Sequence, residues 1–205
     1  MKIASQGFPY IGLCLLMAGA LILFSPTRGL ATPFVLLAGF VTFFFRDPKR
    51  IVPNDPKVLV SPGDGRVVYV GAAEDGSARK QLTMFLSIFD VHINRSPLTA
   101  TVHRIQYTPG RFFAAYKKEA STANEKNEME LVDQGLHVIV RQIAGVIARR
   151  IVCSVRENDR LKRGQRFGLI QFGSRMEVVV PGECELTVRV GDRLKGGESV
   201  IGRRP

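Results

Sequence analysis

The chain has 205 residues, three cysteines and a formal net charge of +11 at pH 7. This length suits one sizeable domain with a small appendage and excludes two independent cores. The cysteines are widely spaced, form no CxxC pair and have no histidine beside them at metal-ligand distance, which excludes a disulfide framework and a zinc site and favours reduced thiols in a cytoplasmic protein.

Nearly all of the positive charge lies outside residues 1–45, which contain two basic residues and no acidic one. The rest of the chain is therefore basic in its own right. Such a charge either keeps the protein soluble or attracts a polyanion, for which nucleic acid and an anionic membrane surface are the two candidates. The position of the apolar residues decides between them.

Two uncharged apolar runs, 8–24 and 30–45, stand back to back at the N-terminus and have 17 and 16 residues. Crossing a hydrocarbon core of about 30 Å takes roughly 20 helical residues, so each run is marginal as a full span. We expect a helical hairpin with its turn at 25–29, either as two short spans or as a re-entrant anchor. A cleaved signal peptide is disfavoured, because a second run follows without a small-residue cleavage site between the two.

Basic residues flank this hairpin at both ends: Lys2 precedes it, and Arg46, Lys49 and Arg50 follow it. Positive flanks prefer the cytoplasmic side of a membrane. We therefore expect a membrane anchor at 1–45 and a domain at 46–205 that faces the anionic inner leaflet of the cell membrane. This arrangement favours lipid over nucleic acid as the partner.

After Pro48 the sequence changes to short β-rich segments separated by turn residues. The SPGDG sequence at 61–65 predicts a tight turn, and the polar stretch 111–130 predicts either the start of a helix or a long active-site loop. The predicted strands are 58–60, 67–70 and 82–88, and strand character returns over 134–155.

An internal echo occupies the C-terminal part, where 159–164 (DRLKRG) and 192–197 (DRLKGG) match at an offset of 33 residues. Each copy follows a β-branched run. This unit resembles the half-barrel of biotinyl and lipoyl carrier domains, but no lysine stands in the hairpin-tip context that a carrier needs. The echo predicts two related hairpins packed together, and the fold class we expect is α+β with a β-rich, barrel-like core.

Between the two echoes an apolar strand reaches Gly173-Ser174, and a second strand begins two residues later. Taken alone, Gly-Ser is an ordinary turn. It is not a nucleophile elbow, because the GxSxG pattern is absent.

The wider sequence resembles the phosphatidylserine decarboxylase family over nearly its whole length. The resemblance is carried by seven motifs in order: RDP at 46–48, SPGDGRV at 61–67, FDVHINRSP at 89–97, YTPGRFFAAYKKEAS at 107–121, NEKN at 124–127, QIAGVIARRIV at 142–152 and RFGLIQFGSR at 166–175. The long form of the family carries Leu-Gly-Ser-Thr and a second histidine. Here the processing site reads Phe-Gly-Ser-Arg and Arg95 stands at the second histidine's place, which indicates the short form.

The resemblance implies that the chain cuts itself at Gly173-Ser174 into fragments 1–173 and 174–205, which remain together as a heterodimer. The Ser174 hydroxyl attacks the carbonyl of Gly173, where glycine offers an unshielded carbonyl and backbone freedom. The resulting ester is lost by β-elimination, and hydrolysis of the dehydroalanine leaves a covalent pyruvoyl cofactor in place of Ser174. No metal is implied.

The attack requires a base, and the resemblance implies His92 for this role, with Asp64 as its orienting carboxylate. Asp90 is the rival, because side chains two residues apart share a face of an extended strand. His103 and His137 lie on predicted strands and are expected to be packed or surface residues.

In the mature enzyme the pyruvoyl ketone would form a Schiff base with the serine headgroup, carbon dioxide would leave, and His92 would protonate Cα. Arg95, Lys117 and Lys118 are candidates to hold the lipid phosphate. The implied reaction converts phosphatidylserine to phosphatidylethanolamine. The alternatives are another pyruvoyl decarboxylase, acting on archaetidylserine or a soluble amino acid, and a non-enzymatic lipoyl-like adaptor anchored in the membrane. A higher oligomer remains open.

Overall fold

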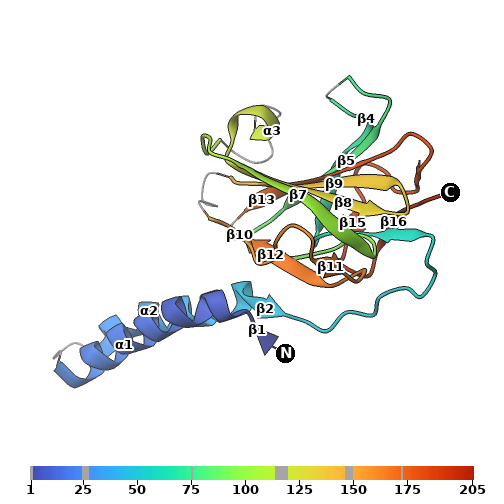
Figure 1. Ribbon diagram of the computed structural model, residues 1–205. Coiled ribbons are helices and arrows are strands. Elements are labelled where there is room, and N and C mark those ends of the chain that lie inside the picture. The colour runs from blue at the N-terminus through green and yellow to red at the C-terminus, as the bar shows by residue number, and fades with distance from the viewer. Residues whose placement is uncertain (1, 25–27, 75, 114–119, 146–149, 172) are drawn as a thin grey trace. The chain divides into compact units, whose positions relative to one another are not determined.

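The computed structural model describes residues 2–24, 28–74, 76–113, 120–145, 150–171 and 173–205. The chain divides into two compact units, Met1–Lys49 and Arg50–Pro205 (Figure 1). The division lies a few residues after the boundary predicted at residue 45.

The first unit is a pair of apolar helices that lie side by side (Figure 1). Its elements are β1 (Lys2–Ile3), η1 (Ser5–Gly7), α1 (Phe8–Phe24), η2 (Arg28–Ala31), α2 (Thr32–Phe44) and β2 (Arg46–Asp47). β1 pairs antiparallel with β2, so the two ends of this unit lie next to each other. A proline in the first turn suits the start of α2, because its missing N–H has no partner there in any helix. Of the predicted turn, residues 25–27 lie outside the described part of the chain.

The second unit is built on a curled, antiparallel eight-stranded sheet, so the mixed α+β class predicted from the sequence is confirmed. The strand order is β11-β7-β8-β9-β13-β5-β4-β15, and two three-stranded sheets, β10-β12-β6 and β14-β16-β3, complete the unit. The bounds are β3 (Val58–Val60), β4 (Gly65–Ala72), β5 (Lys80–Leu86), β6 (Ile93–Arg95), β7 (Ala100–Thr108), α3 (Ala120–Ala123), β8 (Lys126–Asp133), β9 (Leu136–Ile143), β10 (Ile151–Cys153), β11 (Arg160–Leu161), β12 (Arg166–Ile170), β13 (Ser174–Val180), β14 (Glu185–Leu186), β15 (Arg193–Leu194) and β16 (Val200–Arg203).

The strand orders of these sheets are symmetrical about the β9–β13 pair. In the eight-stranded sheet β11, β7, β8 and β9 mirror β15, β4, β5 and β13, and the small sheets match β6, β12 and β10 with β3, β16 and β14. Hydrogen bonds repeat the relation: Val60 N–H donates to the Pro97 carbonyl at 2.9 Å, and Arg95 N–H donates to the Pro62 carbonyl at 2.8 Å. The unit therefore consists of two related halves, and the contiguous half β6–β12 is inserted between β5 and β13 of the other.

The echo segments occupy equivalent places in the two halves. β11 and β15 form the two edges of the large sheet, and the curl of the sheet brings the residues after them together: a Cβ on Gly197 would lie 3.6 Å from Gly164 Cα. The segments therefore pack together as predicted. Neither is a hairpin, however, because β11 pairs with β7 and β15 pairs with β4, which are distant in sequence.

One other element differs from the sequence prediction. In the stretch expected to be a helix start or a loop (111–130), residues 114–119 lie outside the described part of the chain. The described remainder holds the four-residue α3, and β8 begins at Lys126. Burial in β8 alternates strictly, with Met129 and Leu131 in the core and acidic residues between them, which is the period of a strand. The predicted strand 58–60 is confirmed, and 67–70 lies within β4. The strand predicted over 82–88 overlaps β5, which ends two residues earlier, at Leu86.

Candidate active site

The Gly173-Ser174 bond lies where the inserted half of the second unit returns to the other half. Ser174 is the first residue of β13 and pairs with Leu86, the last residue of β5. Its side chain is fully buried, and its hydroxyl oxygen has no hydrogen-bond partner among the described residues. Gly173 has a φ of +65°, in the left-handed region that glycine adopts without penalty. A buried hydroxyl without a hydrogen-bond partner lowers the stability of the fold. Its position directly after a left-handed glycine makes the pair a candidate functional site.

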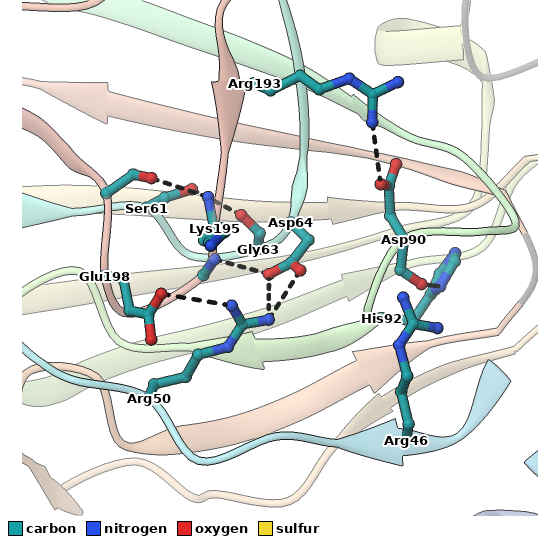
Figure 2. A network of polar contacts seen from close by, with 12 residues as sticks. Arg46, Arg50, Ser61, Gly63, Asp64, Asp90, His92, Arg193, Lys195 and Glu198 are labelled. Carbon is teal, nitrogen blue, oxygen red and sulfur yellow. Dashed lines mark hydrogen bonds and ion pairs between the residues drawn. The ribbon is translucent and has the colours of Figure 1, made fainter. Parts of the chain in front are cut away.

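His92 lies one residue before β6 and is held at this bond by its main-chain neighbours (Figure 2). Its Nδ1 lies 2.9 Å from the carbonyl oxygen of Asp90, an acceptor, so Nδ1 carries the proton. Nε2 is then free to accept, and it accepts a hydrogen bond from Gly173 N–H at 3.2 Å. The imidazole is 2 % exposed. A neutral, desolvated imidazole thus presents its lone pair one peptide unit from the Ser174 hydroxyl.

Asp90 contributes its carbonyl to His92 and uses its carboxylate elsewhere. The carboxylate accepts the Ser87 N–H at 2.8 Å and lies 4.0 Å from Arg193. Asp90 N–H in turn donates to the Ser87 carbonyl at 2.9 Å. These bonds fix a turn between β5 and β6, and the turn determines where the histidine ring points.

Asp64 is held by other partners (Figure 2). Arg50 donates to both carboxylate oxygens at 2.8 and 2.7 Å, and Gly196 N–H donates to Oδ1 at 2.7 Å. Among the described residues the structure therefore places Asp64 with Arg50 and Gly196, and places His92 with Asp90 and Gly173. The hydrogen bond from Gly196 to Asp64 has a counterpart in the other half, where the main-chain N–H of Arg163 donates to the Thr99 hydroxyl at 3.1 Å.

Asp64 nevertheless borders the strand that begins with Ser174. It belongs to the turn 61–65, in which Gly63 packs so closely on Met176 that a Cβ there would lie 3.0 Å from its sulfur. Asn94, two residues after His92, donates to the same sulfur at 3.0 Å. Asp64 can thus affect both reacting residues through the packing of its turn.

A buried chain of amides, which the sequence reasoning missed, joins the strands of the site. Asn127 donates to Gln142 at 2.9 Å, and Gln142 donates to Asn94 at 2.7 Å. All three side chains are at most 3 % exposed. The chain fixes β6, which follows His92, against β8 and β9 beside β13. The only sequence signal was an amide at an inward position of an otherwise apolar strand, as at Gln142.

A second buried group, also missed, lies on the opposite face of β13. Glu177 is 2 % exposed, accepts the Ser121 hydroxyl hydrogen bond at 2.7 Å, and lies 3.3 Å from Arg175 and 3.5 Å from Arg141. Burial alone lowers the pKa of Arg141, but its ion pairs with Glu128 and Glu177 outweigh that effect and raise it. This cluster pins α3 and β9 to β13, so both faces of the strand are fixed.

Comparison with known proteins identifies the family to which this site belongs. A sequence model described as phosphatidylserine decarboxylase matches residues 37–202. The chain belongs to the phosphatidylserine decarboxylase family. A relative in Solibacter usitatus named phosphatidylserine decarboxylase proenzyme is 47% identical over 100% of this chain and 98% of its own length. A relative of the same name in Symbiobacterium thermophilum is 45% identical over 99% of this chain and 96% of its own length.

The remaining predicted residues of this family member lie as follows. Arg95 is buried and donates to the Gly164 carbonyl at 3.0 Å, while Lys117 and Lys118 lie outside the described residues. His103 is exposed on β7, and His137 on β9 is 2.8 Å from Glu130. A groove of about 480 Å³ beside the β4–β5 hairpin is lined by none of the predicted site residues. It lies at the end of these strands away from Ser174.

Proposed function

We propose that this chain is a phosphatidylserine decarboxylase of the pyruvoyl-dependent class, which cuts itself between Gly173 and Ser174 and then converts phosphatidylserine to phosphatidylethanolamine and carbon dioxide. The observation that carries the proposal is the buried Ser174 hydroxyl without a partner, beside the left-handed Gly173 and the lone pair of His92. Family membership supports the same conclusion.

In the first reaction Ser174 Oγ attacks the Gly173 carbonyl carbon, and His92 takes the hydroxyl proton. His92 must exchange its hydrogen bond from Gly173 N–H for one from the hydroxyl, a shift of one peptide unit. The peptide nitrogen receives the proton as the C–N bond breaks and the ester forms. Removal of the Ser174 Cα proton by a base then eliminates the ester as a carboxylate on Gly173. Water hydrolyses the resulting dehydroalanine to the pyruvoyl group and releases ammonia. Such a base contributes about 10²–10⁴ in rate.

The surroundings of Ser174 fit the pyruvoyl group that results. Ser174 is fully buried, and no described group is hydrogen-bonded to its oxygen, so the carbonyl of a pyruvoyl group would displace no existing bond. The pyruvoyl group supplies an electron-accepting carbonyl for the amine of the substrate. His92 is the proposed donor of the proton to Cα after carbon dioxide leaves, because its Nε2 faces the site while Nδ1 stays bound to the Asp90 carbonyl.

Asp64 is still proposed to support His92 and Ser174, but indirectly, by holding a neighbouring turn in place. Its ion pair with Arg50 and its bond from Gly196 hold the turn 61–65 against Met176, and thereby hold the start of β13. Asp90 orients His92 through its main-chain carbonyl. The two aspartates therefore have separable roles.

The two fragments are proposed to stay bound after cleavage. Every residue of β13 is buried between β5 and β9, so the small fragment supplies a central strand. Arg204 of the small fragment also donates to Asp133 of the large one at 2.6 Å. Burial raises the pKa of Asp133, but hydrogen bonds from Arg204 and Arg160 outweigh it and leave that pKa below its ordinary value.

The first unit is the proposed membrane anchor, with the catalytic unit on the cytoplasmic side. The helix Ser5–Phe24 has a mean hydropathy of 2.1, which permits a membrane span by length and composition. Leu16, Leu23 and Leu36 are more than 60 % exposed, as expected for side chains that face lipid. The near-symmetrical halves support the proposed relation to lipoyl-like half-barrels.

The decisive experiment measures the mass of the purified full chain. We expect two fragments that divide at Gly173, with the smaller one lacking an N-terminal α-amine, and release of carbon dioxide from phosphatidylserine vesicles. Ser174→Ala should give one uncleaved, inactive chain. Ser96→Ala is the matched control, because Ser96 is equally buried but is bonded to the Leu98 carbonyl, and it should cleave normally. An active wild-type enzyme in one intact chain would contradict the proposal.

A further inference from the structure

The register of the large sheet brings four connections together at the end where Ser174 lies. Ser174 pairs with Leu86, the last residue of β5, and Arg175 pairs with Ile143, the last residue of β9. Ile143 also pairs with Lys126, the first residue of β8, which pairs with the last residue of β7. Four of the connections that leave or enter the sheet at this end are therefore β5–β6, β7–β8, β9–β10 and β12–β13. We call this end the Ser174 rim.

The exposed phenylalanine and tyrosine side chains among the described residues of the second unit all belong to this rim. Among its described residues, the aromatic side chains classed as exposed are Phe89 at 63%, Tyr107 at 56% and Phe113 at 37%. Phe89 lies in the β5–β6 connection beside Asp90, and Tyr107 is the penultimate residue of β7. An exposed aromatic residue is unremarkable alone, but three at one end of a sheet form a pattern.

Phe113 is held at the rim by a buried side chain. Asn124, 1 % exposed, accepts the Phe113 N–H and donates to the Phe113 carbonyl, both at 2.8 Å. The same Asn124 nitrogen donates to the Ala144 carbonyl at 2.8 Å, next to the end of β9. A buried asparagine thus fixes the main chain of a residue whose ring is exposed. A partner outside the chain that contacts the ring would explain this arrangement.

The charges of the rim suit a polyanionic partner. Arg111 lies over the Phe113 ring, with its guanidinium carbon 5.9 Å from the centroid, and is exposed. Arg150 is also exposed, and its carbonyl accepts the Gln171 N–H at 3.1 Å, two residues before Gly173. The acidic residues in the described part of these connections are Asp90, whose carboxylate lies 4.0 Å from Arg193, and Glu125.

We propose that the Ser174 rim docks on an anionic phospholipid surface, with Phe89, Tyr107 and Phe113 at the headgroup level and Arg111 and Arg150 against the phosphates. Aromatic rings gather at the boundary of headgroups and acyl chains, and each arginine near an anionic leaflet contributes about 1 kcal/mol. The inference rests on the proposed function, because it explains how a lipid headgroup reaches Ser174 without leaving the bilayer. This contact is separate from the helical anchor.

The chain contains no tryptophan, so a single introduced tryptophan is a unique fluorescent probe. Full-length protein carrying Ser174→Ala is reconstituted in phosphatidylcholine vesicles that contain phosphatidylglycerol and brominated lipid, with either Phe89→Trp or Phe113→Trp. Ser77→Trp is the control, because Ser77 is exposed in the β4–β5 hairpin at the other end of the sheet. We expect bromine to quench the two rim probes and to leave the Ser77 probe unquenched.

Equal quenching at all three positions, or none at the rim, would overturn the proposal. Arg111→Gln or Arg150→Gln should lower the ratio of quenched to unquenched rim probe about fivefold, and omitting phosphatidylglycerol should lower it further. Quenching independent of both changes would overturn the anionic part. Because the Ser174→Ala protein is inactive by design and no substrate lipid is present, the result does not depend on decarboxylation. A failure of the proposed function would appear instead as protein with the native Ser174 and the Phe113→Trp probe that is quenched at the rim but releases no carbon dioxide from phosphatidylserine.

Discussion

Replacing Gly173 by alanine tests whether self-cleavage depends on the left-handed backbone before Ser174. The φ of Gly173 is +65°, and a Cβ at this position would meet only Ile88 Cγ2, at an ordinary contact distance of 3.6 Å. The added methyl group therefore brings conformational strain without a clash. An L-residue in this conformation costs roughly 1–2 kcal/mol. If cleavage starts from this conformation, the strain lowers its population, and the rate falls by up to about 5- to 30-fold.

The rate is measured from a time course of cleavage after synthesis in vitro, with the fragments separated by mass. Gly135→Ala is the matched control, because Gly135 has a φ of +81° and open space around it but lies in the β8–β9 turn at the other end of the sheet. Its strain is of the same size, and it should cleave at the wild-type rate. A complete block in Gly173→Ala would refute the reasoning, since strain of this size cannot stop the reaction. Equal slowing of both variants would indicate lost stability instead of local geometry.

Three further predictions concern the residues around this bond and the contact between the fragments. His92→Ala should cleave about 10²–10⁴ times more slowly, whereas His103→Ala, on the exposed side of β7, should cleave normally; normal cleavage of His92→Ala without decarboxylation would restrict His92 to the second reaction. Asp90→Asn should still cleave, because His92 is bonded to the main-chain carbonyl of Asp90. Asp64→Asn should cleave slowly, because Arg50 loses its charged partner. The reverse ranking in a cleavage time course would make Asp90 the orienting carboxylate. The pKa of Asp133 in the folded state is lowered from 3.8, so its stabilising effect is present above that value and is lost as pH falls through the folded pKa. Acid unfolding followed by circular dichroism should therefore show less pH dependence for Asp133→Asn than for the wild type. An unchanged profile would refute the role of the ion pair.

The sequence allowed the α+β class and the place of the Ser174 bond to be predicted, because both depend on local signals. Period-2 alternation and turn residues indicate strands, and a Gly-Ser pair between two apolar strands stands out once the flanking motifs are considered. The partners of Asp64 were not predictable in this way. Arg50, Asp64 and Gly196 come from separate segments that meet only in the folded chain, and Gly196 is separated from Asp64 by 132 positions. The amide chain through Gln142 was missed for the same reason, since its members come from β6, β8 and β9.

The two-half architecture gives a physical reason for the proposed position of the cut. In the inserted half, β8 and β9 are joined by a tight turn at Gln134-Gly135; in the other half, the equivalent strands β5 and β13 are joined only through the entire insert. Ser174 therefore begins a strand whose pairing with β5 and β9 does not need the peptide bond before it. Breaking that bond would free two new ends at the rim and would leave the pairing of β13 with β5 and β9 intact. A cut within β13 would remove a central strand from the sheet, and a cut in the turn at Gln134 would leave the new ends far from the histidine.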